Sequence, residues 1–336
     1  MNRVFFLVMM AIGLSAVGCV RESPREVVVY AALDKEFSEP ILKQFERETG
    51  VRVLAKYDVE SNKTVGLANE IIDSANRPKG DVFWNNEILH SLRLEKLGLL
   101  QVYRSPLAAQ FPAQFVSPDG AWHGFAARAR VLLVNTNLLP NKADWPTSIR
   151  DLADPKWAGK CGLAKPLFGT TATHAAVLFS VWPESEAQQF FEQVKSNAAI
   201  EGGNKQVALN VAAGRYAFGL TDTDDAIIEL EHGQPVAIVF PDQAENQSGA
   251  LLIPNTLCVI KNGPHTESAK KLVDYLLQMR VEEQLAAGAS AQIPLGNGRA
   301  RQSRVAPENL KIMPVDFPKA AEHWTDAQTF LIKLFQ

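Results

Sequence analysis

The fold is decided by residues 27–57, which read VVVYAALDKEFSEPILKQFERETGVRVLAKY. The run opens with β-branched residues, which favour an extended strand. Ser38 and Pro40 then predict the start of a helix, because serine caps helix N-termini and proline is tolerated in the first turn. Gly50 predicts the end of that helix, and a second apolar strand follows it at once. Strand, helix and strand with short connections predict a parallel βαβ unit.

The same alternation extends through the rest of the chain. Two extended segments, at 126–135 and 251–260, interrupt it. Strands are expected at 81–84, 162–164, 217–220 and 236–240, and helices at 64–74, 88–94, 173–180, 184–195, 205–213, 268–279 and 330–335. The two extended segments are interpreted as strands that cross between two similar units. The fold class is therefore α/β, with two lobes that each hold a mostly parallel sheet flanked by helices.

Composition narrows the class of protein. The chain has 336 residues, of which 46% are hydrophobic and 21% charged, with a formal net charge of −3. These values are typical of a globular protein, and the lack of a basic excess argues against a nucleic-acid partner. Cys161 and Cys258 lie in separate apolar strand-like segments, which favours two buried thiols over the alternative of one disulfide.

The N-terminus has the layout of a signal peptide. Arg3 precedes an uncharged apolar run at 4–13, which is shorter than the roughly 20 residues that a membrane-spanning helix needs. Residues 14–19, LSAVGC, resemble a bacterial lipobox. We therefore expect a signal peptide at 1–18 and a lipidated N-terminus and linker at 19–26, with the lipid on Cys19 as the only membrane contact. The alternative is an ordinary secretory signal with an incidental cysteine. Either way the protein is exported, to the periplasm or the cell surface.

Enzyme signatures are absent from the sequence. It contains no G-x-S-x-G, H-E-x-x-H, C-x-x-C or P-loop motif, and no G-x-G-x-x-G between a strand and a helix. Glu87 and Asp224 would supply the two carboxylates of a secreted hydrolase, but nothing supplies the rest of such a site. We therefore expect a binding protein and not an enzyme.

Several blocks in a fixed order carry a family resemblance that covers about residues 27–295. They are VVVYAALDKEFSEPILKQFERETGVRV at 27–53, DVFWNNEILHSLRLEKLGLL at 81–100, ARARVLLVNTNLLP at 127–140, SIRDLADPKWAGKCGLA at 148–164, AAGRYAFGLTDTDDA at 212–226 and NGPHTESAKKLVDYLLQ at 262–278. This order resembles bacterial extracellular solute-binding proteins of family 1, in particular the ferric-iron-binding type.

The resemblance implies a two-lobed periplasmic-binding-protein fold with hinge strands, a solute in the cleft between the lobes and closure on binding. We expect one lobe from 27–128 with 252–290 and the other from 129–251 with 291–336. It also implies an ABC permease and ATPase as partners, and we expect a monomer. A receptor for a membrane partner other than an importer would use the same lobes and cleft.

One departure from the family concerns the ligand. Many ferric-binding relatives carry adjacent tyrosines where this chain has Asp224 and Asp225. Together with Asp222 they form a carboxylate cluster at a strand exit, and Glu87 is expected to complete a metal shell of Glu87, Asp224 and Asp225. Hard oxygen ligands suit Fe(III), Mg²⁺ or Ca²⁺, and the same cluster would also bind an amine. The alternative is that Asp222 and Asp225 only cap the helix beginning at Ala226.

The remaining site candidates lie in loops at the expected carboxyl edges of the strands. Thr170 and Thr171 open a helix whose free N–H groups would bind phosphate, carboxylate or an anion accompanying a metal. Arg128 shares a strand face with Arg130 and would neutralise an anion or form a salt bridge between lobes. The weaker candidates from the first-lobe loops are Asp34, Ser61 and Asn85.

The sequence thus predicts an exported receptor that binds ferric iron, or another hard metal with a synergistic anion, and delivers it to a permease. Iron would be the transported ligand, and no resident cofactor is expected. The alternative ligand is a small organic ion such as a phosphonate, a sugar phosphate, a polyamine or another amine.

Overall fold

The computed structural model describes residues 25–57, 64–297 and 303–336. The predicted signal peptide, the lipidation site Cys19 and the site candidate Ser61 lie outside these residues. Glu26, the last residue of the predicted linker, already belongs to the first strand. Within the described ranges, every helix is too short or too polar to cross a lipid bilayer.

The first lobe begins with the predicted βαβ unit and adds a second one. Its elements are β1 (Glu26–Ala31), α1 (Lys35–Thr49), β2 (Arg52–Tyr57), α2 (Val65–Asp73), β3 (Val82–Asn85) and α3 (Leu89–Lys96). Both β2 and β3 pair with β1 in parallel. The carboxyl ends of β1 and β3 therefore lie at one edge, as the sequence predicted.

Helix α1 starts earlier than the sequence predicted. Its N-cap is Asp34, and Ser38 lies inside the helix, where its hydroxyl donates to the carbonyls of Leu33 and Asp34. A serine hydroxyl can also bond back to carbonyls of the preceding turn from inside a helix, so the presence of serine alone did not fix the boundary. Gly50 ends the helix at φ 70°, a left-handed conformation that glycine adopts without strain.

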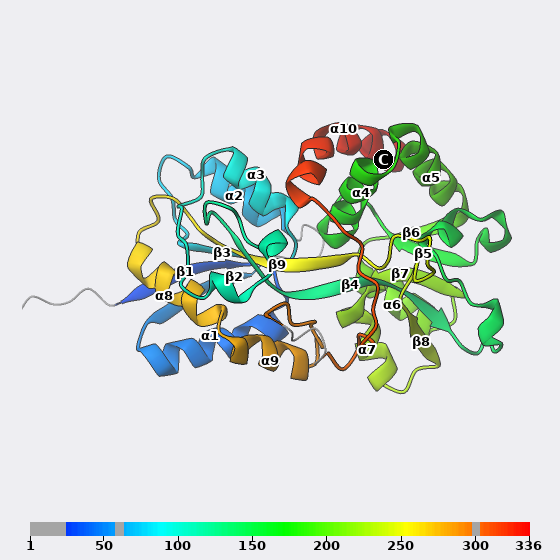
Figure 1. The fold of residues 1–336 in the computed structure, drawn as a ribbon, viewed down its shortest axis with the longest axis horizontal. Helices are drawn as coiled ribbons and strands as arrows, with labels where there is room; N and C mark the ends of the chain where they lie inside the picture. Colours follow the sequence, from blue (N-terminus) through cyan, green and yellow to red (C-terminus); the bar gives the residue numbers. More distant parts are fainter. Residues whose placement is uncertain (1–24, 58–63, 298–302) are drawn as a thin grey trace, which may run out of the picture.

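Two long strands connect the lobes (Figure 1). β4 (His123–Asn135) is buried along its whole length and β9 (Leu252–Val259) runs antiparallel to it. β4 pairs with β9 up to Ala129 and with β7 (Phe218–Asp222) from Arg130 onward. The crossing segments were predicted correctly. They join the two expected sheets into one continuous sheet with the strand order β2-β1-β3-β9-β4-β7-β5-β6. Strand β8 also pairs with β4.

The second lobe repeats the α/β pattern. Besides β7 it holds β5 (Cys161–Ala164), α4 (Gly169–Val181), α5 (Glu184–Asn197), β6 (Ala198–Glu201), α6 (Asn204–Ala212), α7 (Thr223–Glu231) and β8 (Val236–Val239). Strands β6 and β7 both pair with β5 in parallel, whereas β8 and β4 are antiparallel. The sequence interpretation missed β6, a short strand that follows α5 without a turn.

Short 3₁₀ helices and the C-terminal helices complete the described fold. The 3₁₀ helices are η2 (Ala108–Gln110), η3 (Ala113–Phe115), η4 (Lys142–Asp144), η5 (Ile149–Ala153) and η6 (Pro155–Trp157). The C-terminal helices are α8 (Thr266–Leu276), α9 (Met279–Ala287) and α10 (Phe317–Phe335). The predicted helix at 268–279 corresponds to α8, the helix α9 was missed, and α10 begins well before the predicted residue 330.

Two apolar cores support the sheet. One surrounds Phe45 and Trp84 in the first lobe and continues to Val211 of α6 in the second lobe, whereas the other surrounds Phe191 and Phe218 within the second lobe. The C-terminal half of α10 packs into the second core, whereas its first residues contribute to the first core. The residue boundaries of the lobes remain a prediction. Both Cys161 and Cys258 are buried free thiols, as expected.

Candidate functional site

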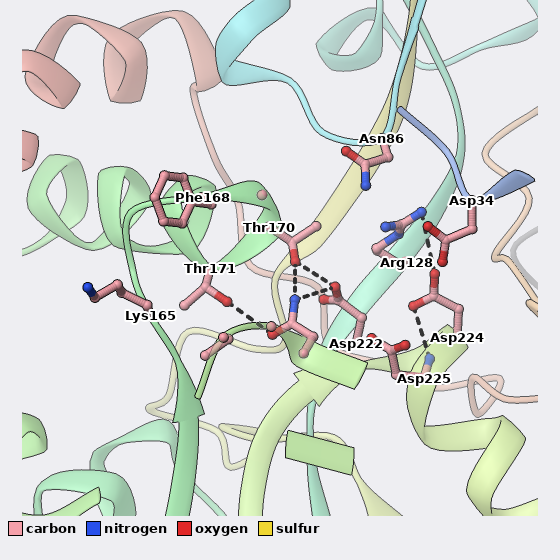
Figure 2. Close-up of a pocket in the computed structure, with 15 residues that line it drawn as sticks. Asp34, Asn86, Arg128, Lys165, Phe168, Thr170, Thr171, Asp222, Asp224 and Asp225 are labelled. Carbon is pink, nitrogen blue, oxygen red and sulfur yellow. Dashed lines mark hydrogen bonds and ion pairs between the residues drawn. The ribbon is translucent and has the colours of Figure 1, made fainter. Parts of the chain in front are cut away.

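A small pocket lies where the carboxyl ends of strands from both lobes face one another (Figure 2). The first lobe contributes Asp34, which follows β1, and Asn86, which follows β3, and the crossing strand β4 contributes Arg128. The second lobe supplies Ala164, Lys165, Phe168, Gly169, Thr170, Thr171, Gly202, Gly203, Asn204, Asp222, Asp224 and Asp225. The pocket is partly open and has a volume of about 50 Å³, whereas one water molecule needs about 10–15 Å³ by the same measure. The pocket therefore suits a compact polar solute or ion.

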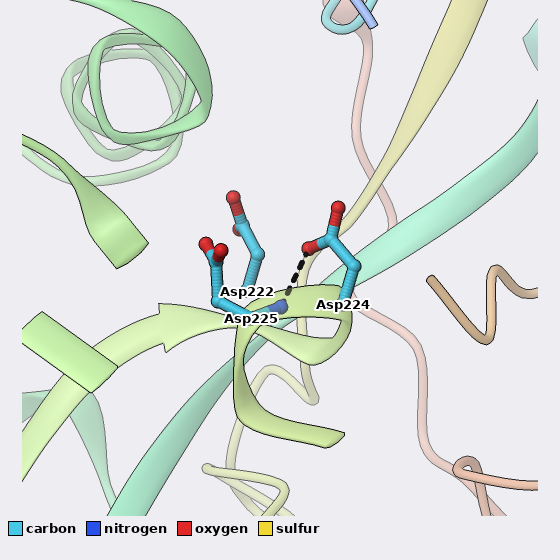
Figure 3. Close-up of side chains that lie close together, drawn as sticks. All are labelled: Asp222, Asp224 and Asp225. Carbon is cyan, nitrogen blue, oxygen red and sulfur yellow. Dashed lines mark hydrogen bonds between the residues drawn. The ribbon is translucent and has the colours of Figure 1, made fainter. Parts of the chain in front are cut away.

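The predicted aspartate cluster lies in the wall of this pocket. Asp222 ends β7 and α7 begins at the next residue, so the turn between them brings Asp222, Asp224 and Asp225 together. Oxygens from the three carboxylates lie within 4.8 Å of one another (Figure 3). Asp222 occupies the N-cap position of α7, but its side chain makes no capping bond there, whereas Asp225 lies in the first turn of the helix.

Asp222 instead belongs to a buried polar network. Arg130 Nη1 donates to Asp222 Oδ1 at 2.7 Å, and Thr170 Oγ1 and Asn204 Nδ2 donate to Oδ2 at 2.5 and 2.9 Å. Arg130 also donates to the hydroxyls of Thr170 and Thr171, at 3.2 Å each. The network fixes the N-terminus of α4 against the end of β7. Because both Asp222 oxygens accept hydrogen bonds within this network, the role of Asp222 is to hold the pocket wall.

Arg128 brings a positive charge into the pocket. Its side chain is 4% exposed, and Nη2 lies 3.4 Å from Asp224 Oδ2. Burial acts to lower the pKa of Arg128, but the carboxylates of Asp224, Asp222, Asp34 and Asp225 outweigh burial and raise it. Neither Nε nor Nη2 donates a hydrogen bond within the described residues. Arg128 therefore stays charged and retains donors for a solute.

Two helix N-termini form the opposite side of the pocket. α4 begins at Gly169, at φ 55°, and α6 begins at Asn204 directly after Gly202 and Gly203. The first N–H groups of a helix have no partner inside the helix and carry partial positive charge. With Lys165 nearby, this side favours an anionic group.

The sequence candidates separate into two groups. Those that line the pocket are Asp34, Arg128, Thr170, Thr171, Asp222, Asp224 and Asp225. Asn85 and Glu87 do not: Asn85 Nδ2 donates to Glu87 Oε1 and to Ser91 Oγ.

The structure does not fit the prediction that Glu87 is a metal ligand. Its carboxylate is 1% exposed and accepts hydrogen bonds from the N–H groups of Leu89 and His90, from Asn85 and from Thr173 Oγ1. These bonds satisfy the first turn of α3 and occupy both oxygens. Glu87 precedes the N-cap residue Ile88, and a carboxylate there can accept from the free N–H groups of the first turn, a pattern that was misread as a metal ligand.

Sequence reasoning also missed residues that line the pocket. Asn86, Lys165 and Asn204 line the pocket and were not among the predicted site residues. Gly202 and Gly203 immediately before a helix were the available signal for a second N-terminus at the site. Without β6, the sequence offered no reason to place that turn at the same edge as Asp222.

Comparisons with known proteins agree with this architecture. The model of the bacterial extracellular solute-binding protein family matches residues 89–322, more than half of the chain. Iron uptake protein A2 of Synechocystis sp. is 29% identical over 256 residues, which cover 70% of this chain and 72% of that protein.

Solved structures share the fold over nearly the whole chain. Iron-bound HitA from Pseudomonas aeruginosa has a TM-score of 0.80 at 21% identity and covers 93% of this chain and 100% of its own. AfuA from Actinobacillus pleuropneumoniae, with fructose-6-phosphate bound, has a TM-score of 0.78 at 25% identity, with 92% and 96% covered. These matches confirm the predicted two-lobed fold.

The same comparisons confirm the predicted kind of protein. Its relatives include proteins named for iron uptake and for Fe(3+) binding, and the similar HitA holds iron in its solved structure. One of its relatives is an Fe(3+)-binding periplasmic protein of Serratia marcescens. The chain therefore belongs to the bacterial extracellular solute-binding proteins, a family of non-enzymatic receptors.

Proposed function

We propose that this protein is the solute receptor of an ABC importer, and that its solute is a small organic phosphate or phosphonate that also carries hydroxyl or amine groups. The observation that carries the proposal is the two-sided charge of the pocket. Lys165 and the N-termini of α4 and α6 line one side, with the Lys165 side chain extending away from the aspartates in Figure 2, and Asp34, Asp224 and Asp225 line the other.

Each side matches one part of such a solute. Helix N-termini and lysine bind phosphate oxygens, whereas carboxylates accept strong hydrogen bonds from hydroxyl and ammonium groups. Arg128 lies between the sides with donors still available, and its charge would offset a bound anion next to the aspartates. The fructose-6-phosphate held by the similar AfuA has this combination of groups.

Ferric iron with a synergistic anion is the second candidate. The carboxylate cluster of Asp222, Asp224 and Asp225 and the similarity to an iron uptake protein favour it, because Fe(III) prefers hard oxygen ligands. Three features weigh against it. Asp222 is already bonded to Arg130, Arg128 repels a cation, and none of the described pocket residues is a tyrosine.

The test is to identify the solute directly. Protein purified without chelators is analysed for metals and by native mass spectrometry, and calorimetry then compares fructose-6-phosphate, 2-aminoethylphosphonate, putrescine and ferric citrate. We expect a phosphate ester or phosphonate to bind. Arg128→Met should weaken that binding at least about 30-fold, since losing one partner of a buried charged contact costs about 2 kcal/mol or more. Arg52→Met, at an exposed ion pair in β2, is the control.

The outcomes separate the candidates. Stoichiometric iron that is lost in Asp224→Ala with Asp225→Ala would establish the second candidate instead. Binding of putrescine alone would contradict the proposed anion side. Binding of none of the four, with no co-purified ligand, would contradict both candidates.

Delivery and anchoring form the rest of the proposal. The receptor would close on the solute, present it to a permease driven by an ATPase, and stay at the membrane through lipid on Cys19. Membrane fractionation after expression of the full chain tests the anchor. Cys19→Ala should release the protein into the soluble exported fraction, whereas unchanged membrane association would contradict lipidation.

A further inference from the structure

We infer that Glu87 and Thr173 form the hydrogen bond that holds the two lobes together when the receptor closes. Glu87 is then a residue that positions the second lobe and does not contact the solute. The inference rests on the proposed function only in assuming that the receptor opens and closes around its pocket.

The two residues come from opposite lobes. Glu87 lies between β3 and α3, and Thr173 lies in the first turns of α4. Thr173 Oγ1 donates to Glu87 Oε2 at 2.8 Å, and the residues are 0% and 1% exposed. A buried hydrogen bond to a carboxylate is shorter and stronger than one between neutral groups. It is therefore a substantial contact between the lobes.

Both partners can separate at low cost. Without Thr173, Glu87 keeps its bonds from Asn85 and from the N–H groups of Leu89 and His90, all within the first lobe. Thr173 Oγ1 also lies 3.4 Å from the carbonyl of Gly169, one turn earlier in α4. In an open receptor the hydroxyl would return to this carbonyl, and water would replace it at Glu87. The bond can thus form and break without leaving an unsatisfied group.

The position of Thr173 ties this bond to the pocket. Thr170 and Thr171 line the pocket and lie one turn of α4 before Thr173. Fixing Thr173 against Glu87 therefore fixes these hydroxyls and the α4 N-terminus relative to Asp34 and Asn86 of the first lobe. Lys205 and Glu36 also meet across the lobes, at 3.8 Å, but both are more than half exposed and such pairs contribute little.

The Lys205 and Glu36 positions allow closure to be measured. In a parent variant with Glu36→Cys and Lys205→Cys, the rate of disulfide formation reports how often the lobes meet. Of the three natural cysteines, Cys161 and Cys258 are buried, and Cys19 is replaced by alanine in the parent and in every variant so that it cannot pair. Rates are compared between the parent and three variants of it that also carry Thr173→Val, Thr173→Ser or Thr329→Val. Each rate is measured without solute and again with fructose-6-phosphate. Thr329 is the matched control, because its hydroxyl bonds one turn back in α10 and reaches no other lobe.

We expect Thr173→Val to slow crosslinking about tenfold or more, the effect of losing a hydrogen bond to a charged acceptor. Thr173→Ser, which keeps the hydroxyl, should restore the parent rate, and Thr329→Val should leave it unchanged. Equal crosslinking rates in Thr173→Val and the parent, with and without solute, would overturn the inference. A rate in Thr173→Ser as slow as the rate in Thr173→Val would overturn it as well. Because crosslinking without solute needs no ligand, failure of the proposed solute would leave this result unaffected.

Discussion

Replacing Arg130 by methionine is expected to lower the free energy of unfolding by about 3–5 kcal/mol, the usual cost of removing one partner of a buried ion pair. Arg130 is 0% exposed and Asp222 is 2% exposed, and their contact is 2.7 Å. Methionine has a similar length but leaves the Asp222 charge uncompensated. It also removes the donors to Thr170 and Thr171. The pocket should weaken together with the fold, because these hydroxyls line it.

Urea denaturation followed by circular dichroism measures this loss, and adding Asp222→Asn supplies the decisive comparison. Asparagine removes the uncompensated charge and still accepts from Thr170, so Arg130→Met with Asp222→Asn should be more stable than Arg130→Met by about 1–2 kcal/mol. Arg52→Met at the exposed pair with Glu26 should cost less than about 1 kcal/mol. If Arg130→Met costs no more than Arg52→Met, or if adding Asp222→Asn lowers stability further, the pair does not hold the α4 N-terminus as described.

Other predictions concern pH, thiols and a close backbone contact. Burial, with a smaller effect of the nearby Arg130, lowers the pKa of His174 to about 3. As the pH falls, the unfolded state therefore binds a proton before the folded state does, and stability should fall from about pH 6.5 downward. The loss at pH 5 should be about 2 kcal/mol from this residue, and His174→Gln should flatten the pH profile of the urea midpoint; an unchanged profile would contradict a buried neutral imidazole. Burial raises the pKa of Cys161 and of Cys258 to about 12, so neither thiol should react with iodoacetamide at pH 8 until urea unfolds the protein, and labelling of the native protein would refute their burial. Gly249→Ala should cost about 2 kcal/mol or more, because φ is 90° and the new Cβ would lie 2.6 Å from the Lys311 carbonyl oxygen; a thermal midpoint equal to wild type would show that this segment can move.

The sequence predicted those parts of the fold that local pattern determines. The β1–α1–β2 unit, the crossing segments and most helices follow from residue periodicity and from glycine and proline positions. The helix boundary at Asp34 and the strand β6 did not, because Ser38 satisfies backbone groups from inside the helix and β6 has no preceding turn residue. The strand β6 depends on pairing with β5, whereas the α1 boundary depends on which of two local roles Ser38 takes.

Most residues of the site could be predicted from the sequence, but the contacts that each of them makes could not. Aspartates at a strand exit and threonines at a helix start were found, because their positions follow from the βαβ pattern. No sequence pattern indicates that Asp222 pairs with Arg130 or that Glu87 bonds to Thr173 from the other lobe. Such pairings join residues about 90 positions apart, and only the packed structure decides them.

The crossing strands have a consequence for the order in which the chain can fold during synthesis. The first lobe is translated first, yet β3 reaches the rest of the sheet only through β9, which ends at residue 259. The strands of the second lobe are complete once β8 has been made, at residue 239. A nascent chain can therefore complete the strands of the later lobe while the earlier lobe still has an open sheet edge at β3, and α10 packs into the core of the later lobe only afterwards. Exposed edges invite pairing with other chains, so this interval is when a holding chaperone would protect the protein most.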